Sequence, residues 1–287
     1  MKTKLTFTTT GAWDLADGFG CASLGLPGLC DNEGKIVTEH SSDLDGTVLC
    51  GTYKDVLARI EQLVKKPLAA IVLFGNVGGE NRFMTDLQKL ISCPMVGGGA
   101  AIDGPTGRSG LITGGGEVAV FLITDERYTY RAVTQCIHDR IIGQVQLTLA
   151  DPRTILTVNG IDAGTFLAEK RVELGLKDTD FEHLTISDLN HVNAHLSFVD
   201  GVIKSGRDVQ ESMLLRYVEH DKVYDAMAKF YDDENAIVFG CAGLAGLLDR
   251  PIDSKALGLF LFGEVCTVDG KAEFGNLMLS KLVIEPK

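Results

Sequence analysis

The chain has 287 residues, of which 45% are hydrophobic, and 39 acidic against 27 basic side chains give it a net charge of −12. This length is enough for one large domain or about two smaller ones, and for a sizeable core. The acidic balance argues against a nucleic-acid partner and against an anionic membrane surface, and no apolar run reaches the roughly 18–20 residues that a membrane-spanning helix needs.

The cysteines indicate a reducing compartment. There are seven, an odd number, and they lie scattered in apolar surroundings, as Cys50 and Cys93 do. Reduced core thiols fit this pattern better than a disulfide framework does. The first residues, Met1 to Phe7, alternate like a strand and lack the apolar core of a signal peptide. We therefore expect a cytoplasmic protein.

The first part of the chain mixes strands and helices. Thr52 is placed to cap a helix over residues 54–65, whose apolar positions form a helical stripe. Short apolar or alternating runs predict strands at residues 4–9, 35–38, 70–76 and 117–123. A further strand is predicted to lead into the glycines that begin at residue 97. A short helix is expected at 11–17 and an amphipathic stretch at 84–91, whereas 18–51 is expected to be rich in loops.

The second part adds more strands, joined by short turns. Strands are predicted at residues 128–133, 140–149, 154–158, 184–198, 204–214, 235–241, 256–265 and 273–284. Helices are predicted at 221–232 and at 163–175, where Phe166, Leu167 and Val172 are expected on one side. The pairs Asn159–Gly160, Asp200–Gly201 and Asp269–Gly270 are typical of tight turns.

Strands and helices do not alternate strictly along this chain. Strict alternation would indicate a doubly wound Rossmann domain, whereas many short turns between neighbouring strands favour antiparallel pairing. The sequence therefore predicts an α+β fold of mixed, largely antiparallel sheets, with helices packed outside.

Two segments resemble each other and predict an internal duplication. Ala-Ile-Val-Leu-Phe-Gly-Asn at residues 70–76 resembles Ala-Ile-Val-Phe-Gly-Cys at 236–241, and each run is followed by a helix, a strand and a glycine turn. Superposing the two copies matches Asn76 with Cys241, and the turn at 97–99 with the pair Gly263–Glu264. We expect two related halves, residues 1–158 and 159–287. The other interpretation is that buried strands resemble one another in any α/β protein.

Polar side chains follow a glycine at the ends of two of these strands. Cys241 and Glu264 occupy such positions, where backbone can approach a ligand and a side chain can point into a cleft. Glu264 lies among apolar residues, and a buried carboxylate must be paired or hydrogen-bonded, so we expect it to meet a ligand or to cap backbone amides. Asn276 interrupts the next strand and is a plausible partner. Cys241 is an activated nucleophile, a pocket wall or an inert core thiol.

The glycine-rich residues 96–110 invite a phosphate-loop interpretation that the details do not support. Arg108 stands where a Walker motif has Lys, and no helix opens on the glycines. A backbone nest for a carboxylate or phosphate is one alternative, with Arg108 as a bidentate clamp and Asp103 close by. A tight turn between strands is the other.

The histidines do not predict a metal site. His191 and His195 have the i, i+4 spacing of a zinc helix, but Val192 replaces the glutamate, and on a strand the two rings would lie roughly 13 Å apart. There is no Cys-x-x-Cys motif for structural zinc or c-type haem. No cofactor is predicted, although a non-covalent haem needs only one histidine and stays open.

The C-terminal part resembles a known family. Residues 256–279, Ala-Leu-Gly-Leu-Phe-Leu-Phe-Gly-Glu-Val-Cys-Thr-Val-Asp-Gly-Lys-Ala-Glu-Phe-Gly-Asn-Leu-Met-Leu, resemble the closing signature of FIST (F-box and intracellular signal transduction) proteins. Residues 236–243 resemble the Phe-Ser-Cys-Ala segment that precedes this signature. Residues 97–101 resemble the Gly-Gly-Ser-Ala-Ala-Gly turn of the family's N-terminal domain. Residues 155–166 resemble the junction of the family's two domains. The likeness begins near Leu68.

Some positions depart from the family pattern. Gly275 stands for His, Leu277 and Met278 stand for Gln and Thr, and Leu244 stands for Arg. If those positions touch ligand in the family, the ligand of this protein differs or its site is degenerate.

The resemblance implies a sensory module that binds a small, amino-acid-like molecule. Some bacterial members bind haem and sense nitric oxide, and eukaryotic relatives join the module to an F-box. We expect a stand-alone sensor that works in signal transduction through a protein partner or a homo-oligomer. No catalytic residue is assigned, and an enzyme that uses Cys241 is the alternative. The predicted ligand site comprises Asn76, Gly97, Gly98, Gly99, Asp103, Arg108, Cys241, Gly263, Glu264 and Asn276.

Overall fold

The computed structural model describes most of the chain. It covers residues 2–7, 18–19, 24–25, 38–64, 67–75, 80–99, 102–103, 108–109, 117–177, 181–248, 250, 252 and 257–287. The predicted helix at 11–17 lies outside these residues, as does nearly all of the predicted strand at 35–38.

Five α-helices and one 3₁₀ turn occur in the described residues. The helices are α1 (Tyr53–Leu63), α2 (Glu80–Leu90), α3 (Ala163–Leu174), α4 (His220–Tyr231) and α5 (Ala242–Gly246), and the 3₁₀ turn is Phe181–His183. The strands up to residue 136 are β1 (Lys2–Phe7), β2 (Gly18–Phe19), β3 (Leu24–Gly25), β4 (Thr38–Gly51), β5 (Ala70–Gly75), β6 (Met95–Gly99), β7 (Ile102–Asp103), β8 (Arg108–Ser109), β9 (Val118–Ile123) and β10 (Tyr128–Cys136).

The remaining strands extend almost to the last residue. They are β11 (Arg140–Asp151), β12 (Thr154–Val158), β13 (Ile161–Asp162), β14 (Leu184–Ser187), β15 (Asn193–Ala194), β16 (Leu196–Val199), β17 (Val202–Ser205), β18 (Ser212–Tyr217), β19 (Ala236–Cys241), β20 (Leu257–Leu261), β21 (Glu264–Val268), β22 (Lys271–Gly275) and β23 (Met278–Pro286). The predicted α+β class, with mixed and antiparallel sheets, is confirmed.

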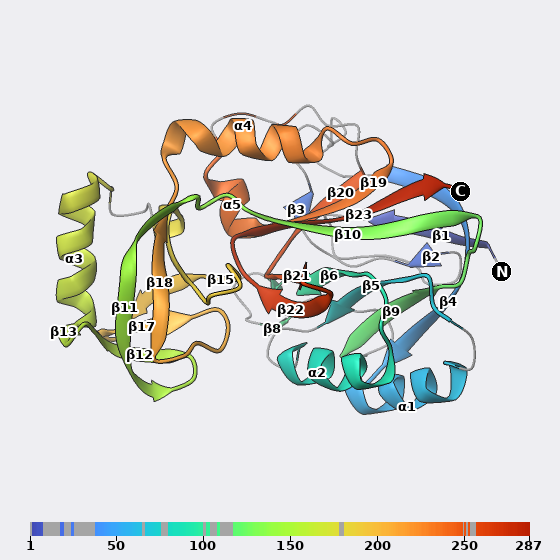
Figure 1. Cartoon of the computed structure of the whole chain (residues 1–287), viewed down its shortest axis with the longest axis horizontal. Coiled ribbons are helices and arrows are strands. Elements are labelled where there is room, and N and C mark those ends of the chain that lie inside the picture. The colour runs from blue at the N-terminus through green and yellow to red at the C-terminus, as the bar shows by residue number, and fades with distance from the viewer. Residues whose placement is uncertain are drawn as a thin grey trace.

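Two sheets packed face to face form the larger part of the molecule (Figure 1). The first sheet has the order β2-β1-β4-β9-β5-β6-β21-β22, and the second has the order β10-β23-β19-β20-β3. Val72 and Phe74 of β5 point between the sheets and meet Phe239 of β19, with the Phe74 and Phe239 rings edge to face at 5.7 Å. Helices α1 and α2 cover the outer face of the first sheet, and α4 and α5 cover that of the second.

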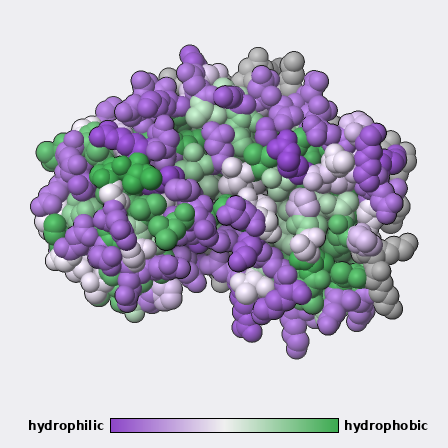
Figure 2. Space-filling model, in the orientation of Figure 1, coloured by the Kyte–Doolittle hydropathy of each residue, from purple (hydrophilic) through white to green (hydrophobic). Residues whose placement is uncertain are grey.

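Residues 140–217 build a separate lobe beside this sandwich (Figure 1). Its sheet has the order β15-β14-β18-β11-β12-β17-β16, with β13 paired to β12, and α3 packs on it through Phe166 and Leu167. Among the described residues, most of the exposed large hydrophobic side chains belong to this lobe: Ile141, Leu156, Ile161, Val172, Leu189, Phe198 and Val199. On the face shown in Figure 2, hydrophobic surface in the lobe is interspersed with hydrophilic surface.

The two sheets of the sandwich share one connectivity, as the predicted duplication requires. In the first, β5 pairs parallel to β6 through α2 and antiparallel to β9, which pairs with β4. In the second, β19 pairs parallel to β20 and antiparallel to β23, which pairs with β10, and α5 follows β19. Helix α1 precedes β5 as α4 precedes β19. The second copy therefore starts at β10, and the lobe is inserted between β10 and α4.

The predicted boundary at 158/159 does not separate sheets. It coincides with the turn of the β12–β13 hairpin inside the lobe, where Asn159 has φ 53° and Gly160 has φ 76°. The turn itself was predicted correctly, as were the turns at Asp200–Gly201 and Asp269–Gly270, where all four residues have positive φ.

Several long apolar runs are broken where the sequence predicted continuous strands. Residues 256–265 form β20 in one sheet and β21 in the other, because Gly263 adopts φ 93° between them. Residues 273–284 break at Asn276 and Leu277, where Leu277 has φ 53°. Residues 184–198 form three short strands, and 204–214 contain a break between β17 and β18.

Two further predictions were wrong. The segment 18–51, expected to be rich in loops, contains the 14-residue strand β4, which pairs with both β1 and β9. Val172, expected beside Phe166, is 85% exposed. At about 100° per residue it lies roughly 240° around the helix from Phe166, which places it on the solvent face.

Candidate functional site

The carboxyl ends of strands from both copies meet at one place. The chain leaves β20 at Leu261, crosses to the first sheet through Phe262 and Gly263, and there Glu264 pairs with Gly98 of β6. Gly99 N–H donates to the Gly263 carbonyl at 2.9 Å, and Phe262 N–H donates to the Gly99 carbonyl at 3.1 Å. The two predicted glycine turns are therefore in direct contact.

This contact requires glycine. A Cβ on Gly98 would lie 2.1 Å from the Gly263 carbonyl oxygen, and a Cβ on Gly97 would lie 1.7 Å from the Leu73 carbonyl oxygen. Gly97 and Gly263 also have φ 125° and 93°, which side chains disfavour. Gly97 and Gly98 thus allow backbone to pack on backbone, and this explains the occurrence of these two glycines independently of any phosphate.

Glu264 is the most unusual residue of the site. Its side chain is fully buried, its Oε2 accepts from Met278 N–H at 3.2 Å, and its Oε1 has no hydrogen-bond partner among the described residues. Burial raises the pKa of this carboxyl well above its ordinary value, while the Met278 amide and the Cys241 thiol oppose the rise. The uncharged, protonated form of this carboxyl is therefore favoured when no cation reaches it.

Cys241 lies beside Glu264, at the end of β19 and the start of α5. It is 6% exposed, and burial, followed by the neighbouring Glu264, raises the pKa of the thiol. A nucleophilic cysteine needs the opposite shift, because the thiolate is the reactive form. The position favours a pocket wall or a core thiol over the nucleophile considered as an alternative.

Asn276 connects this place to the inserted lobe. Its side chain lies between two glycines: a Cβ on Gly263 would be 2.8 Å from Asn276 Nδ2, and a Cβ on Gly206 would be 2.4 Å from Oδ1. Its Oδ1 accepts from His195 N–H at 3.3 Å, and its own N–H donates to the Asn193 carbonyl at 3.0 Å. Asn276 is close to Gly263 as predicted, but its hydrogen bonds go to the lobe and not to Glu264.

The lobe contributes two residues that the sequence did not single out for this site. His195 Nε2 lies 3.9 Å from Glu182 Oε1, and both side chains are partly exposed. Glu182 Cγ and Cys241 Sγ would lie 3.3 and 3.8 Å from a Cβ on Gly243, so Glu182 adjoins the Cys241 end of β19. The spacing of His191 and His195 argued against a zinc site and left His195 as a sheet-surface or pocket histidine, and the sequence holds no signal that brings position 182 next to 241.

Three predicted site residues are not placed at this site. Asn76 lies outside the described residues. Asp103 and Arg108 are paired with each other in the two-stranded sheet of β7 and β8, and their side chains lie outside the described part. The nest hypothesis stays a prediction.

His138 and His191 make hydrogen bonds within the protein. His138 is fully buried, its Nε2 lies 2.7 Å from the Glu182 carbonyl, and burial lowers its pKa to about 4. His191 Nδ1 lies 3.0 Å from a nitrogen of Arg216. Within the residues that the structure describes, no group of three or more His, Cys, Asp or Glu side chains could hold a metal ion.

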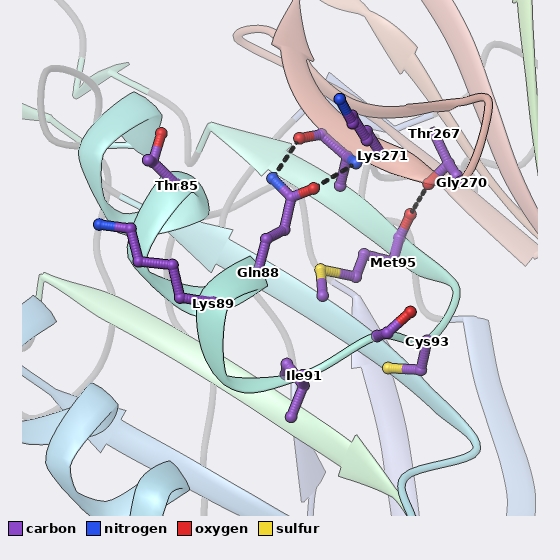
Figure 3. A pocket seen from close by; sticks show the side chains of 11 residues that line it. Thr85, Gln88, Lys89, Ile91, Cys93, Met95, Thr267, Gly270 and Lys271 are labelled. Carbon is purple, nitrogen blue, oxygen red and sulfur yellow. Dashed lines mark hydrogen bonds between the residues drawn. The ribbon is translucent and has the colours of Figure 1, made fainter.

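Two surface cavities lie away from the strand ends, along α2 and β22. One measures about 410 Å³ and includes Cys93, Met95 and Thr267 (Figure 3); the other measures about 340 Å³ and includes Met84, Arg207 and Phe274. Burial raises the pKa of the Cys93 thiol to about 12, which leaves it uncharged. Polar residues on one side of a helix are typical of solvent exposure, so no feature of the sequence indicated these cavities.

A scan against protein-family models matched none of them, and a search of curated proteins found no match. The resemblance to FIST proteins is therefore a prediction that rests on the residues quoted above. Among the described residues, no helix is long and apolar enough to cross a membrane.

Proposed function

We propose that this protein binds a small molecule at the strand-end site, which we define as Gly97–Gly99, Cys241, Gly263, Glu264 and Asn276. The observation that supports this most is the fully buried Glu264, whose Oε1 lacks a partner in the described structure. Buried polar atoms are nearly always satisfied in folded proteins, and an exception calls for an explanation such as a ligand.

The chemistry of the site favours a ligand with a cationic amino group. An ammonium placed at Oε1 would supply both the missing donor and the positive charge that a buried carboxylate requires. Binding would then release the Glu264 proton. An amino acid or a related amine fits this requirement, in agreement with the ligand class that the FIST resemblance implies.

The signalling role is part of the same proposal. A sensory protein must pass on the occupancy of its site, and Asn276 joins this site to the inserted lobe through Asn193 and His195. We propose that the lobe, or a partner or second copy that contacts it, carries the output.

Two experiments test this function. Mass spectrometry of the natively purified protein identifies retained molecules, and thermal-shift measurements with the twenty amino acids and simple amines test binding directly. We expect at least one amine to raise the Tm of the wild type and to have no effect on Glu264→Gln. Glu285→Gln, which changes an exposed glutamate on β23, serves as the matched control. An amine that stabilises both variants equally would contradict the role of Glu264.

Calorimetry gives a second readout. If an ammonium ionises Glu264, binding releases a proton, and the apparent enthalpy depends on the ionisation enthalpy of the buffer. An enthalpy that is the same in phosphate and in Tris would show that no proton is released.

A further inference from the structure

The edge of the first sheet at β22 is incompletely paired. Among the described strands, β22 is the last of this sheet and has β21 as its one neighbour. Ala272 directs its N–H and carbonyl away from β21, since both bond to Gln88, and Asn276 directs its N–H to Asn193. Alternate residues of an antiparallel strand face the same way, so Phe274 also faces outward. No described residue hydrogen-bonds to the Phe274 backbone.

The Gln88 side chain takes the place of a neighbouring strand (Figure 3). Its Nε2 donates to the Ala272 carbonyl at 2.6 Å and its Oε1 accepts from Ala272 N–H at 2.9 Å. One residue of an antiparallel neighbour would exchange the same two bonds with Ala272. A carboxamide is chemically a peptide group, so this side chain marks where a peptide fits.

A groove runs along this edge on both sides of Gln88. The 410 Å³ cavity lies toward Gly270 and contains Ile91 and Met95, and the 340 Å³ cavity lies toward Phe274 and contains Met84. Both are bordered by Thr85, Gln88, Lys271 and Ala272. Strand β22 has five residues, which span about 17 Å in extended conformation. The groove is therefore long enough for a short extended segment.

We propose that an extended peptide segment of a partner protein adds to β22 as an antiparallel strand and displaces the Gln88 carboxamide. Its backbone pairs with Phe274 and Ala272, and its apolar side chains enter the cavities beside Met84 and Met95. The Phe274 ring adjoins Gly263 of the strand-end site, but the peptide would bind along the outer edge of β22, and this proposal does not depend on the proposed function.

The charge at one end of the groove selects an acidic peptide. Lys271 is exposed and has no acidic partner within the described structure, and the Lys89 side chain on the same cavity is 68% exposed and pairs with Asp86 at 2.7 Å. An antiparallel peptide runs from Phe274 toward Lys271, so its C-terminal residues lie beside these two cations. A glutamate or a terminal carboxylate there makes a favourable contact, although the chain as a whole carries a charge of −12.

The probe is an N-terminally labelled pentapeptide, Thr-Val-Thr-Val-Glu, with a free C-terminal carboxylate, and binding is followed by fluorescence anisotropy. We expect saturable binding to the full chain, and about tenfold tighter binding to Gln88→Ala, because the competing carboxamide is removed. Gln62→Ala, which removes an exposed glutamine from α1, is the matched control and leaves the affinity unchanged.

Backbone pairing is tested on the peptide, so that the protein fold is not at risk. N-methylation of alternate peptide amides removes the donors that face β22 in one version and those that face solvent in the other. We expect the first version to lose binding and the second to keep it. Equal binding of both versions would overturn the proposal.

Two other outcomes also overturn it. No saturable binding to Gln88→Ala at millimolar peptide would do so. Self-association of Gln88→Ala without peptide binding, measured by light scattering, would show that Gln88 only protects an exposed edge, as natural sheets commonly require.

Discussion

Glu264 shows how one buried carboxyl makes stability depend on pH. Its pKa in the folded protein is raised, so the folded state holds a proton that the unfolded state loses above its ordinary value of 4.5. The stabilising effect of this proton is complete below that value and is lost as pH rises toward the raised pKa.

We therefore expect wild-type stability to decline with pH relative to Glu264→Gln, by about 1.4 kcal/mol per pH unit within that window. Glutamine keeps the shape of the side chain but cannot titrate. Urea unfolding of the ligand-free protein between pH 5 and 8 measures the difference. Glu285→Gln should follow the wild type, and parallel curves for wild type and Glu264→Gln would show that Glu264 is not held protonated.

The Cys241 thiol should be unreactive, because its burial beside Glu264 raises its pKa. We expect iodoacetamide at pH 8 to leave it unmodified in the folded protein and to modify it after unfolding in urea. Peptide mapping by mass spectrometry reads each cysteine separately. If folded Cys241 were modified faster than free cysteine, the alternative that Cys241 is an activated nucleophile would be supported.

Helix α1 illustrates what local sequence determines at the scale of an element. Thr52 Oγ1 accepts from Asp55 N–H at 3.2 Å, as the predicted cap requires, and Val56 and Ile60 are buried on the side that faces the sheet. We expect Thr52→Ala to lower the free energy of unfolding by about 1 kcal/mol and Thr52→Ser to restore most of the loss. Urea denaturation measures both, and an equal loss in both variants would mean that the hydroxyl is not the cause.

Helices and tight turns were predictable because their signals lie within a few residues. The breaks in the apolar runs were not. Residues 256–265 satisfy the pattern of one buried strand, and only the partners of β20 and β21 show that the chain changes sheets at Gly263. For residues 18–51 the error is the opposite one, since a strand was missed. Strand β4 is rich in polar residues, and its pairing with β1 and β9 overrides their low strand preference.

At the scale of the whole molecule, two similar strands led to the prediction of a duplication, and the two sheets do share one connectivity, whereas the place of the lobe could not be predicted. The lobe separates β10 from α4 in sequence but not in space, and no composition change marks its ends. The same limit applies to the candidate site. The predicted repeat and the family turn positions together placed Glu264, Cys241 and Gly98 near one another, while Glu182 and His195 come from the inserted lobe, which neither signal located.

The lobe is attached to the sandwich partly through Asn276, which fits against Gly206 with no space for a further carbon. A Cβ at Gly206 would lie 2.4 Å from Asn276 Oδ1, whereas a Cβ at Gly143 has no neighbour within 4 Å. We expect Gly206→Ala to destabilise the protein by about 1–3 kcal/mol, as overpacking does, and Gly143→Ala to have little effect. Urea denaturation compares them, and equal stabilities would show that the Asn276 side chain moves aside easily.

Because the chain crosses between the sheets at Phe262 and Gly263, each half of the sandwich needs the other to complete its sheet. Strand β6 of the first copy receives its outer neighbour, β21, from the second copy, far downstream in the chain. If the gene were cut between β9 and β10, the first fragment would leave the edge of β6 without a neighbouring strand. The second fragment would carry the β21–β22 hairpin without the sheet to which it pairs. Neither fragment should remain in solution when produced alone, whereas producing both together should restore a heterodimer that elutes like the intact chain.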